Sequence, residues 1–324
     1  MRTRTLDSPP SILPLYARAA LPLIPGASLL PFVPGRGREI PETELVLEGV
    51  RPDPDAVTAY ARVCGFSLRD TLPPTYPHIL AFPLHMATMA DSSFPFGAVG
   101  LVHVENRIVQ RRPIGIGEEL KLVVRPTPLQ PHKRGQTFGL LTEAQIGEET
   151  AWESTSTFLR RGPSQTAVEV ESGMRTKPLR RDAEGGAVDA PEPEEGLTAS
   201  ATWRLGGDLG RRYAAVSGDR NPIHMHSLTA KPLGFPSAIA HGMWTKARCL
   251  AALGGRLPDA FAVEVGFRKP IRLPGAVEFL SDADGEEIDF AVRDAKRHTP
   301  HLDGRLTPLE AKAGPKQTTG RKSK

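Results

Sequence analysis

The first hydrophobic pattern with a clear period follows Asp53. Its apolar residues recur every three or four positions, which places them on one face of a helix; they are Val57, Tyr60, Val63 and Cys64. Asp53 is a typical helix-capping residue, and Gly65 is typical of a helix end. The pattern therefore predicts a helix between these two residues. A second, buried helix is predicted from Ile79 to Met89 because that segment is apolar throughout, despite Pro83.

After this helix, the chain shows the alternation of apolar and polar residues that is typical of strands. Four strands are predicted in this half, at 101–109, 119–125, 137–146 and 151–160. The second half repeats the order. A helix capped by Asp208 ends at Gly218, and an apolar helix runs from Gly242 to Gly254. Four more strands are predicted at 261–268, 276–281, 287–293 and 301–306. This order favours an α+β fold.

The two halves resemble each other closely enough to indicate a duplicated domain. Residues 59–65 are similar to 212–218, and residues 112–117 are similar to 269–275. The interval after the first helix is longer in the second copy, where it holds Asp219 and His224. We therefore expect one copy to keep the chemistry, while the other keeps the scaffold and a wall that faces the substrate.

Composition and charge exclude several classes of protein. The net charge is +4, but residues 311–324 carry five positive charges and no acid, so the rest is close to neutral. A nucleic-acid-binding face is therefore not predicted. No apolar run approaches the roughly 18 residues of a membrane span. Cys64 and Cys249 lie in apolar contexts without metal-ligand spacing, which predicts reduced, buried thiols and a cytoplasmic location.

The densest group of catalytic residue types lies between Tyr213 and Met243. It combines an acid, Asp219, with His224 across a Pro-fixed turn, and Gly242 opens the apolar helix. His224 can act as an acid or as a base near neutral pH. Because Pro222 favours extended geometry in the residue before it, the turn lets both side chains face one cavity. The N–H groups at the start of a helix stabilise developing negative charge.

Both blocks, Tyr213-Ala-Ala-Val-Ser-Gly-Asp-Arg-Asn-Pro-Ile-His224 and Ile239-Ala-His-Gly-Met243, resemble the MaoC-like, R-specific enoyl-thioester hydratase family. The two-part chain is similar to its double hot-dog members, including mycobacterial-type (3R)-hydroxyacyl-thioester dehydratases. The resemblance implies a double hot-dog fold, in which two long central helices are each wrapped by an antiparallel sheet. It also implies reversible dehydration of (3R)-hydroxyacyl thioesters to trans-2-enoyl thioesters.

The resemblance assigns Asp219 and His224 as the catalytic pair and the Gly242 N–H as donor to the thioester carbonyl. Supporting roles are expected for Ser217, Asn221 and His241, although His241 fits equally well as a packed residue at the helix start. Arg268 and Lys269 either meet coenzyme A phosphates or form a solvated strand end. His224 and His226 have a spacing seen in metal sites, but without a third suitable ligand no metal is expected. No organic cofactor is expected either.

The predicted organisation is an irregular N-terminal arm (1–40) with one short helix, a non-catalytic hot-dog domain (41–162), a linker (163–196), a catalytic hot-dog domain (197–308) and a disordered basic tail (309–324). The expected partner is a coenzyme A (CoA) or acyl carrier protein (ACP) thioester, and the protein is expected to be a monomeric double hot-dog or a homodimer. Two alternatives remain. A hot-dog thioesterase would release free thiol, and a non-catalytic acyl-binding subunit would bind acyl-CoA without adding water.

Overall fold

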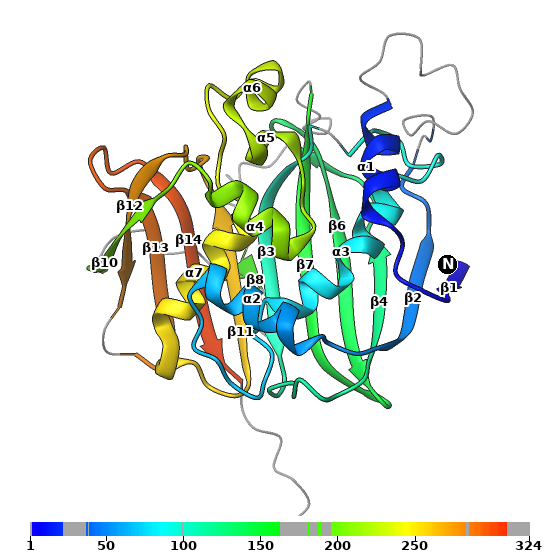
Figure 1. Ribbon diagram of the computed structural model, residues 1–324, viewed down its shortest axis with the longest axis horizontal. Coiled ribbons are helices and arrows are strands. Elements are labelled where there is room, and N and C mark those ends of the chain that lie inside the picture. The colour runs from blue at the N-terminus through cyan, green and yellow to red at the C-terminus, as the bar shows by residue number, and fades with distance from the viewer. Residues whose placement is uncertain are drawn as a thin grey trace, which may run out of the picture.

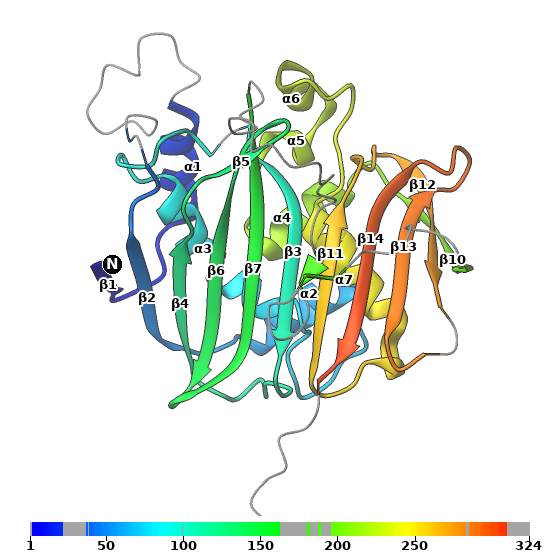
Figure 2. The ribbon, with the colours of Figure 1, turned by 180° about the vertical axis from the view of Figure 1, so that it is seen from behind.

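One large sheet and a layer of helices on one of its faces make up the body of the protein (Figures 1 and 2). The computed structural model describes residues 2–21, 37, 39–98, 100–162, 180–181, 187–188, 196–282 and 285–309. Figure 2, seen from behind, shows the strands in front of the helices. None of the described helices is long and apolar enough to span a membrane.

The first half begins with a strand and a short helix and continues with the first repeat. Its elements are β1 (Arg2–Leu6), α1 (Ile12–Ala20), β2 (Thr43–Val50), α2 (Pro54–Cys64), α3 (Tyr76–Met89), β3 (Val102–Gln110), β4 (Leu120–Pro126), β5 (Gln130–His132), β6 (Gly135–Ile146) and β7 (Glu149–Arg161). A pair of two-residue strands follows, β8 (Arg180–Arg181) and β9 (Ala187–Val188).

The second half has the same order with a longer connection between its helices. Its elements are β10 (Thr198–Leu205), α4 (Leu209–Ser217), α5 (Pro222–Met225), α6 (Ser227–Ala230), η3 (Lys231–Leu233), α7 (Gly242–Leu253), η4 (Gly254–Arg256), β11 (Phe261–Phe267), β12 (Gly275–Ser281), β13 (Ile288–Asp294) and β14 (Pro300–Pro308). The segments α5, α6 and η3 fill the interval that the first repeat lacks.

The duplication is visible in the order of the strands. The first repeat runs β2-β4-β6-β7-β3 across the sheet, and the second continues as β11-β14-β13-β12-β10. The repeats therefore have equivalent strand orders related by a pseudo-two-fold axis at the junction. There β3 and β11 pair antiparallel, with Asn106 opposite Val265. The equivalent tyrosines of the two copies, Tyr60 and Tyr213, are buried with ring centroids 6.1 Å apart.

A buried lysine ties the second central helix to this junction. Lys246 of α7 is fully buried, and its Nζ donates to the Asn106 carbonyl (3.0 Å), to Asn106 Oδ1 (2.6 Å) and to the Val263 carbonyl (3.1 Å). Asn106 in turn donates to Ser154 and Ser156. Buried polar groups need such partners. The network fixes α7, which carries Gly242, relative to strands from both repeats.

Most predicted elements are present, with differences that have physical causes. The helix after Asp53 and the helix from Gly242 lie where they were predicted, and Asp53 accepts from the Asp55 N–H as a cap. The helix predicted at Ile79 begins earlier, at Tyr76, because Pro77 fits a first turn. Asp208 lies at the start of α4, but its side chain makes no capping hydrogen bond, so that prediction was wrong.

Each repeat also has a strand that was not predicted, β2 or β10, before its first helix, and the first repeat has the short unpredicted strand β5 as well. The predicted short helix of the N-terminal arm is α1, but the arm is less irregular than expected, since β1 adds a parallel strand beside β2 at the sheet edge. Most of the predicted linker (163–196) and basic tail (309–324) lies outside the described residues. The exceptions are β8, β9, residue 196 at the end of the linker and residue 309 at the start of the tail.

Candidate active site

The loop that joins α4 to α5 is built by three local signals. Gly218 ends α4 in the left-handed conformation (φ 74°). Asn221 caps α5 by accepting a hydrogen bond from the Ile223 N–H (3.4 Å), and Pro222 occupies the first turn. Gly210 lets α5 approach α4, because a Cβ there would lie 1.9 Å from the His224 carbonyl oxygen. The loop therefore leaves α4 and returns His224 against it.

Asp219 lies at the centre of this loop, with its side chain 28% exposed. Its Oδ1 accepts hydrogen bonds from the Tyr16 hydroxyl (2.7 Å) and from the Asn221 N–H (3.1 Å). Its own N–H donates to Ser217 Oγ (3.2 Å). Burial raises the pKa of Asp219, but the imidazoles of His241 and His224 and these hydrogen bonds outweigh burial and hold it below its ordinary value. Asp219 is therefore a carboxylate at neutral pH.

His224 is buried on α5 with one ring nitrogen engaged. Its Nδ1 lies 2.8 Å from the carbonyl oxygen of Ile239, which can only accept, so Nδ1 carries the proton. In the neutral ring, Nε2 is then a free acceptor. Burial lowers the pKa of His224, although the charge of Asp219 and the bond to Ile239 oppose this. The imidazole is thus neutral at pH 7, with its basic nitrogen available.

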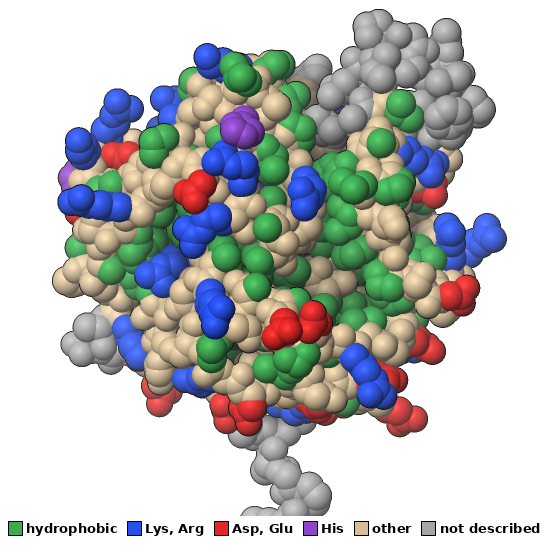
Figure 3. Space-filling model, viewed as in Figure 1, with side chains coloured by type: hydrophobic (Ala, Val, Ile, Leu, Met, Phe, Trp, Pro, Cys, Tyr) green, Lys and Arg blue, Asp and Glu red, His purple; other side chains and the backbone are tan. Residues whose placement is uncertain are grey.

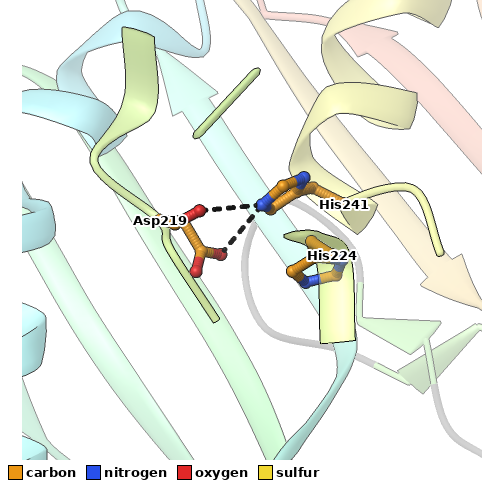
Figure 4. Close-up of side chains that lie close together, drawn as sticks. All are labelled: Asp219, His224 and His241. Carbon is orange, nitrogen blue, oxygen red and sulfur yellow. Dashed lines mark hydrogen bonds and ion pairs between the residues drawn. The ribbon is translucent and has the colours of Figure 1, made fainter. Parts of the chain in front are cut away.

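His241 stacks on His224, with ring centroids 3.6 Å apart, and faces Asp219 (Figure 4). Its Nε2 donates to the Asp219 carbonyl (3.0 Å) and lies 3.8 Å from Asp219 Oδ2. Burial and the neighbouring His224 lower the pKa of His241 to about 3. The sequence left two roles open for His241, a supporting role and simple packing. The contacts favour the supporting role, because the neutral ring bonds to the Asp219 carbonyl and stacks on the ring of His224.

Gly242 follows His241 and is the first residue of α7. Its N–H has no carbonyl one turn earlier in the helix to bond with. A Cβ at this position would lie 3.0 Å from the ring of Phe267, so no side chain fits without moving that ring. Glycine therefore leaves the start of α7 open to a ligand atom.

These residues line a cavity of about 280 Å³ to which both repeats contribute. The first repeat supplies side chains of α3 together with residues of β3 and β7: His78, Phe82, His85, Met86, Met89, His103 and Phe158. Tyr16 and Ala19 of α1 also line it. On this face of the molecule, hydrophobic side chains gather beside α1, and lysines and arginines lie both on the side of the second repeat and at the opposite edge (Figure 3). An apolar cavity with a few polar groups is typical of a small-molecule site.

His85 of α3 is buried in the first repeat, with its Nε2 2.7 Å from Thr142 Oγ1, and it also lines the cavity. Its ring lies 4.9 Å from that of His78, which is stacked 6.4 Å from His103. Burial lowers the pKa of all three rings, to about 4 for His78 and about 3 for His103, so these three histidines of the first-repeat wall are uncharged at neutral pH.

Arg268 and Lys269 both line the cavity, at the end of β11. Arg268 forms an ion pair with Asp303, in which Nη2 lies 2.7 Å from Oδ2, so its guanidinium is already engaged. Lys269 is exposed, and among the described residues no hydrogen bond or ion pair is found for its ammonium group. Of the two, Lys269 is therefore the residue that can meet an anionic group of a ligand.

Asp219, His224 and His241 also form a cluster that could hold a metal ion, since one ligand atom from each lies within 4.8 Å of the others. His226, whose spacing from His224 is one seen in metal sites, is exposed and does not belong to it. Coordination by His241 Nε2 would require the loss of its proton and of its bond to the Asp219 carbonyl. The hydrogen-bonded arrangement suits acid–base chemistry without that change.

Comparison with known proteins agrees with this arrangement. Residues 190–300 match the family model described as a MaoC-like domain. The 3-hydroxyacyl-thioester dehydratase X of Mycobacterium tuberculosis is 36% identical over 284 residues, which cover 87% of this chain and 95% of that protein. The chain belongs to the MaoC-like dehydratase family.

The crystal structure of HtdX from Mycobacterium tuberculosis superimposes with a TM-score of 0.69 at 33% identity, over 82% of this chain and all of the other. An (R)-specific enoyl-CoA hydratase from Aeromonas caviae is 29% identical over 110 residues, 34% of this chain and 80% of that protein. The strand order and the structural match confirm the predicted double hot-dog fold.

One contact of the site was not anticipated from the sequence. The structure brings together Ser217, Asp219, Asn221, His224, His241 and Gly242, as the spacing of the motif indicated, but Tyr16 comes from about 200 residues away. It lies in a Pro-interrupted N-terminal segment without a periodic pattern, and it belongs to neither repeat. Nothing in its local sequence indicated that it reaches Asp219.

Proposed function

We propose that this protein is a hydro-lyase that reversibly dehydrates (3R)-hydroxyacyl thioesters to trans-2-enoyl thioesters. The observation that carries the proposal is the meeting of a carboxylate, Asp219, and a neutral imidazole, His224, in a cavity where the start of α7 is kept open by Gly242. The names of the M. tuberculosis and A. caviae relatives describe the two directions of this reaction.

Proton transfer in the proposed reaction uses the two acceptor atoms that the protein leaves free. Asp219 Oδ1 and His224 Nδ1 are held by hydrogen bonds, so Asp219 Oδ2 and His224 Nε2 remain for the substrate. In dehydration the pair takes a proton from C2 and returns one to the leaving hydroxyl of C3. The products are the enoyl thioester and water, and the pair ends with the protons it had at the start. Such groups contribute about 10²–10⁴-fold to a rate.

Negative charge that develops on the thioester oxygen is stabilised, in this proposal, by the Gly242 N–H at the helix start. Removal of a C2 proton moves electron density to that oxygen, and an N–H at the positive end of a helix matches the charge. The Lys246 network holds α7 against β3 and β11 and so keeps this N–H in place. A metal or an organic cofactor is not needed for these steps.

The first repeat supplies the wall of the acyl pocket, and the second repeat supplies the reacting groups. The side chains of α3 that line the cavity support this division into a non-catalytic domain (41–162) and a catalytic domain (197–308). Because one chain contributes both walls, we expect a monomer to be sufficient for activity, with a homodimer as the alternative. Lys269 is proposed to meet a phosphate of CoA or an acidic group of ACP. The buried, unpaired cysteines support a reducing, cytoplasmic location.

The direct test is loss of enoyl-thioester absorbance when the full-length protein is mixed with a chain-length series of trans-2-enoyl-CoA substrates. Coupling to an R-specific dehydrogenase then identifies the configuration of the product. A thiol reagent in a parallel reaction measures release of free CoA, which only the thioesterase alternative produces. Binding of acyl-CoA without water addition would support the acyl-binding alternative, and an S-configured product would contradict the proposed stereochemistry.

A further inference from the structure

The N-terminal helix α1 packs directly on the catalytic loop of the second repeat. Ile12 approaches Gly218 so closely that a Cβ on this glycine would lie 2.6 Å from Ile12 Cδ1. One turn later, the Tyr16 hydroxyl donates to Asp219 Oδ1 (2.7 Å) and accepts the Arg220 N–H (2.9 Å). Tyr16 therefore contacts both the side chain of Asp219 and the backbone of the residue after it.

We propose that Tyr16 is a positioning residue for the reaction, which orients the Asp219 carboxylate so that only Oδ2 faces the substrate. The inference rests on the proposed function. Oδ1 receives two donors, the Tyr16 hydroxyl and the Asn221 N–H, and this leaves it poorly placed to accept a third proton from the substrate. Oδ2 lies toward His241 and receives no hydrogen bond within 3.5 Å among the described residues.

The direction of the Tyr16 hydrogen bond is fixed by its second partner. Because the Arg220 N–H can only donate, the phenol oxygen accepts it and points its own proton at Asp219. Burial raises the pKa of Tyr16, and the charge of Asp219 and the hydrogen bond to it act in the same sense. The phenol therefore keeps its proton and donates a charge-assisted bond, the stronger kind, to the carboxylate.

The bond also helps to keep Asp219 ionised. The groups that face this carboxylate are Tyr16 of α1, His224 of α5 and His241 before α7, with Tyr213 of α4 and, further away, His78 and His103 of the first repeat. Among these, Tyr16 is a neutral donor that stabilises only the charged form of the acid. Its removal is expected to raise the pKa of Asp219.

Tyr16→Phe tests the proposal, because it removes one hydroxyl and keeps the ring that packs α1. The kcat for enoyl-CoA hydration should fall about 10- to 100-fold, the effect expected for a hydrogen bond to a charged group. KM should change much less, and the acid limb of the pH–rate profile should move to higher pH. Leu13→Ala is the matched control, since Leu13 is 70% exposed on the same helix and does not line the cavity.

A second measurement does not depend on turnover. In protein labelled with ¹³C at aspartate carboxyl groups, the Asp219 signal is assigned by its loss in Asp219→Asn, and its titration is followed by NMR. The midpoint should be higher in Tyr16→Phe than in wild type and unchanged in Leu13→Ala. An unchanged midpoint in Tyr16→Phe, or an equal loss of kcat in Leu13→Ala, would overturn the assignment. A shifted midpoint in a protein without hydratase activity would support the Tyr16 contact and remove the proposed function.

Discussion

Replacing Asp219 with asparagine removes one negative charge from the cavity and leaves the shape of the side chain almost unchanged. The amide oxygen can still accept from the Tyr16 hydroxyl and the Asn221 N–H, while an NH₂ group takes the place of Oδ2. An NH₂ group cannot accept a proton at neutral pH. We therefore expect kcat to fall about 10²–10⁴-fold, the usual contribution of a positioned acid–base group.

The effect on stability should be much smaller than the effect on activity. Two hydrogen bonds change from charge-assisted to neutral, at about 1 kcal/mol each, and this is offset in part because a half-buried charge is removed. The net change in the free energy of unfolding should stay within about 2 kcal/mol at pH 7. The loss of kcat corresponds to about 3–6 kcal/mol, since 1.4 kcal/mol is a factor of ten.

The pH dependence gives a second signature of the same variant. The folded pKa of Asp219 lies below its unfolded value, so its carboxylate contributes stability above the unfolded pKa. That contribution is lost as the pH falls through the folded pKa. Asp219→Asn lacks it at every pH. The free energies of unfolding of wild type and Asp219→Asn, measured with urea, should therefore differ near neutrality by this contribution. The difference should disappear in acid.

Asp91→Asn is the matched control for these measurements. Asp91 Oδ1 also accepts from the N–H two residues later, that of Ser93 (2.8 Å), but Asp91 does not line the cavity. Its kcat should equal that of wild type. A kcat for Asp219→Asn above about one tenth of wild type, in folded protein, would refute the acid–base role of Asp219.

Three further variants test the other parts of the site. His224→Ala should lower kcat about 100-fold or more. It also removes the hydrogen bond to Ile239, so the free energy of unfolding measured with urea should fall by about 1 kcal/mol. Because burial lowers the pKa of His224, wild-type activity should decline only at a pH below the ordinary histidine range. Gly242→Ala should lower kcat because its Cβ meets Phe267, whereas Gly255→Ala, with no atom within 4 Å of the added Cβ, should not; equal kcat values would contradict the inference that the start of α7 must stay free of a side chain. Lys269→Ala should raise the KM for CoA substrates a few-fold at low salt, and an unchanged KM would remove Lys269 from carrier binding.

The order of elements was predictable because it depends on local patterns. The helix between Asp53 and Gly65 has a capping residue, a 3.6-residue period and a left-handed end, and all three lie within a dozen residues. The repeats were predictable for a similar reason, since equivalent residues such as Tyr60 and Tyr213 occupy equivalent positions. The strands β2 and β10 were missed because each lies before the first helix of its repeat. The strands that were predicted all follow the second helix, as consecutive segments with alternating apolar and polar residues.

The residues of the site around Asp219, His224 and Gly242 could be identified from the chain alone, because they are close in sequence and a glycine, a proline and a helix start fix their loop. Their surroundings depend on how distant elements pack. The tertiary structure brought Tyr16 onto Asp219, lined the cavity with α3 of the other repeat, and engaged Arg268 with Asp303 while Lys269 remained exposed. These contacts join residues far apart in sequence, and their partners are chosen by how the helices pack on the shared sheet rather than by any local period.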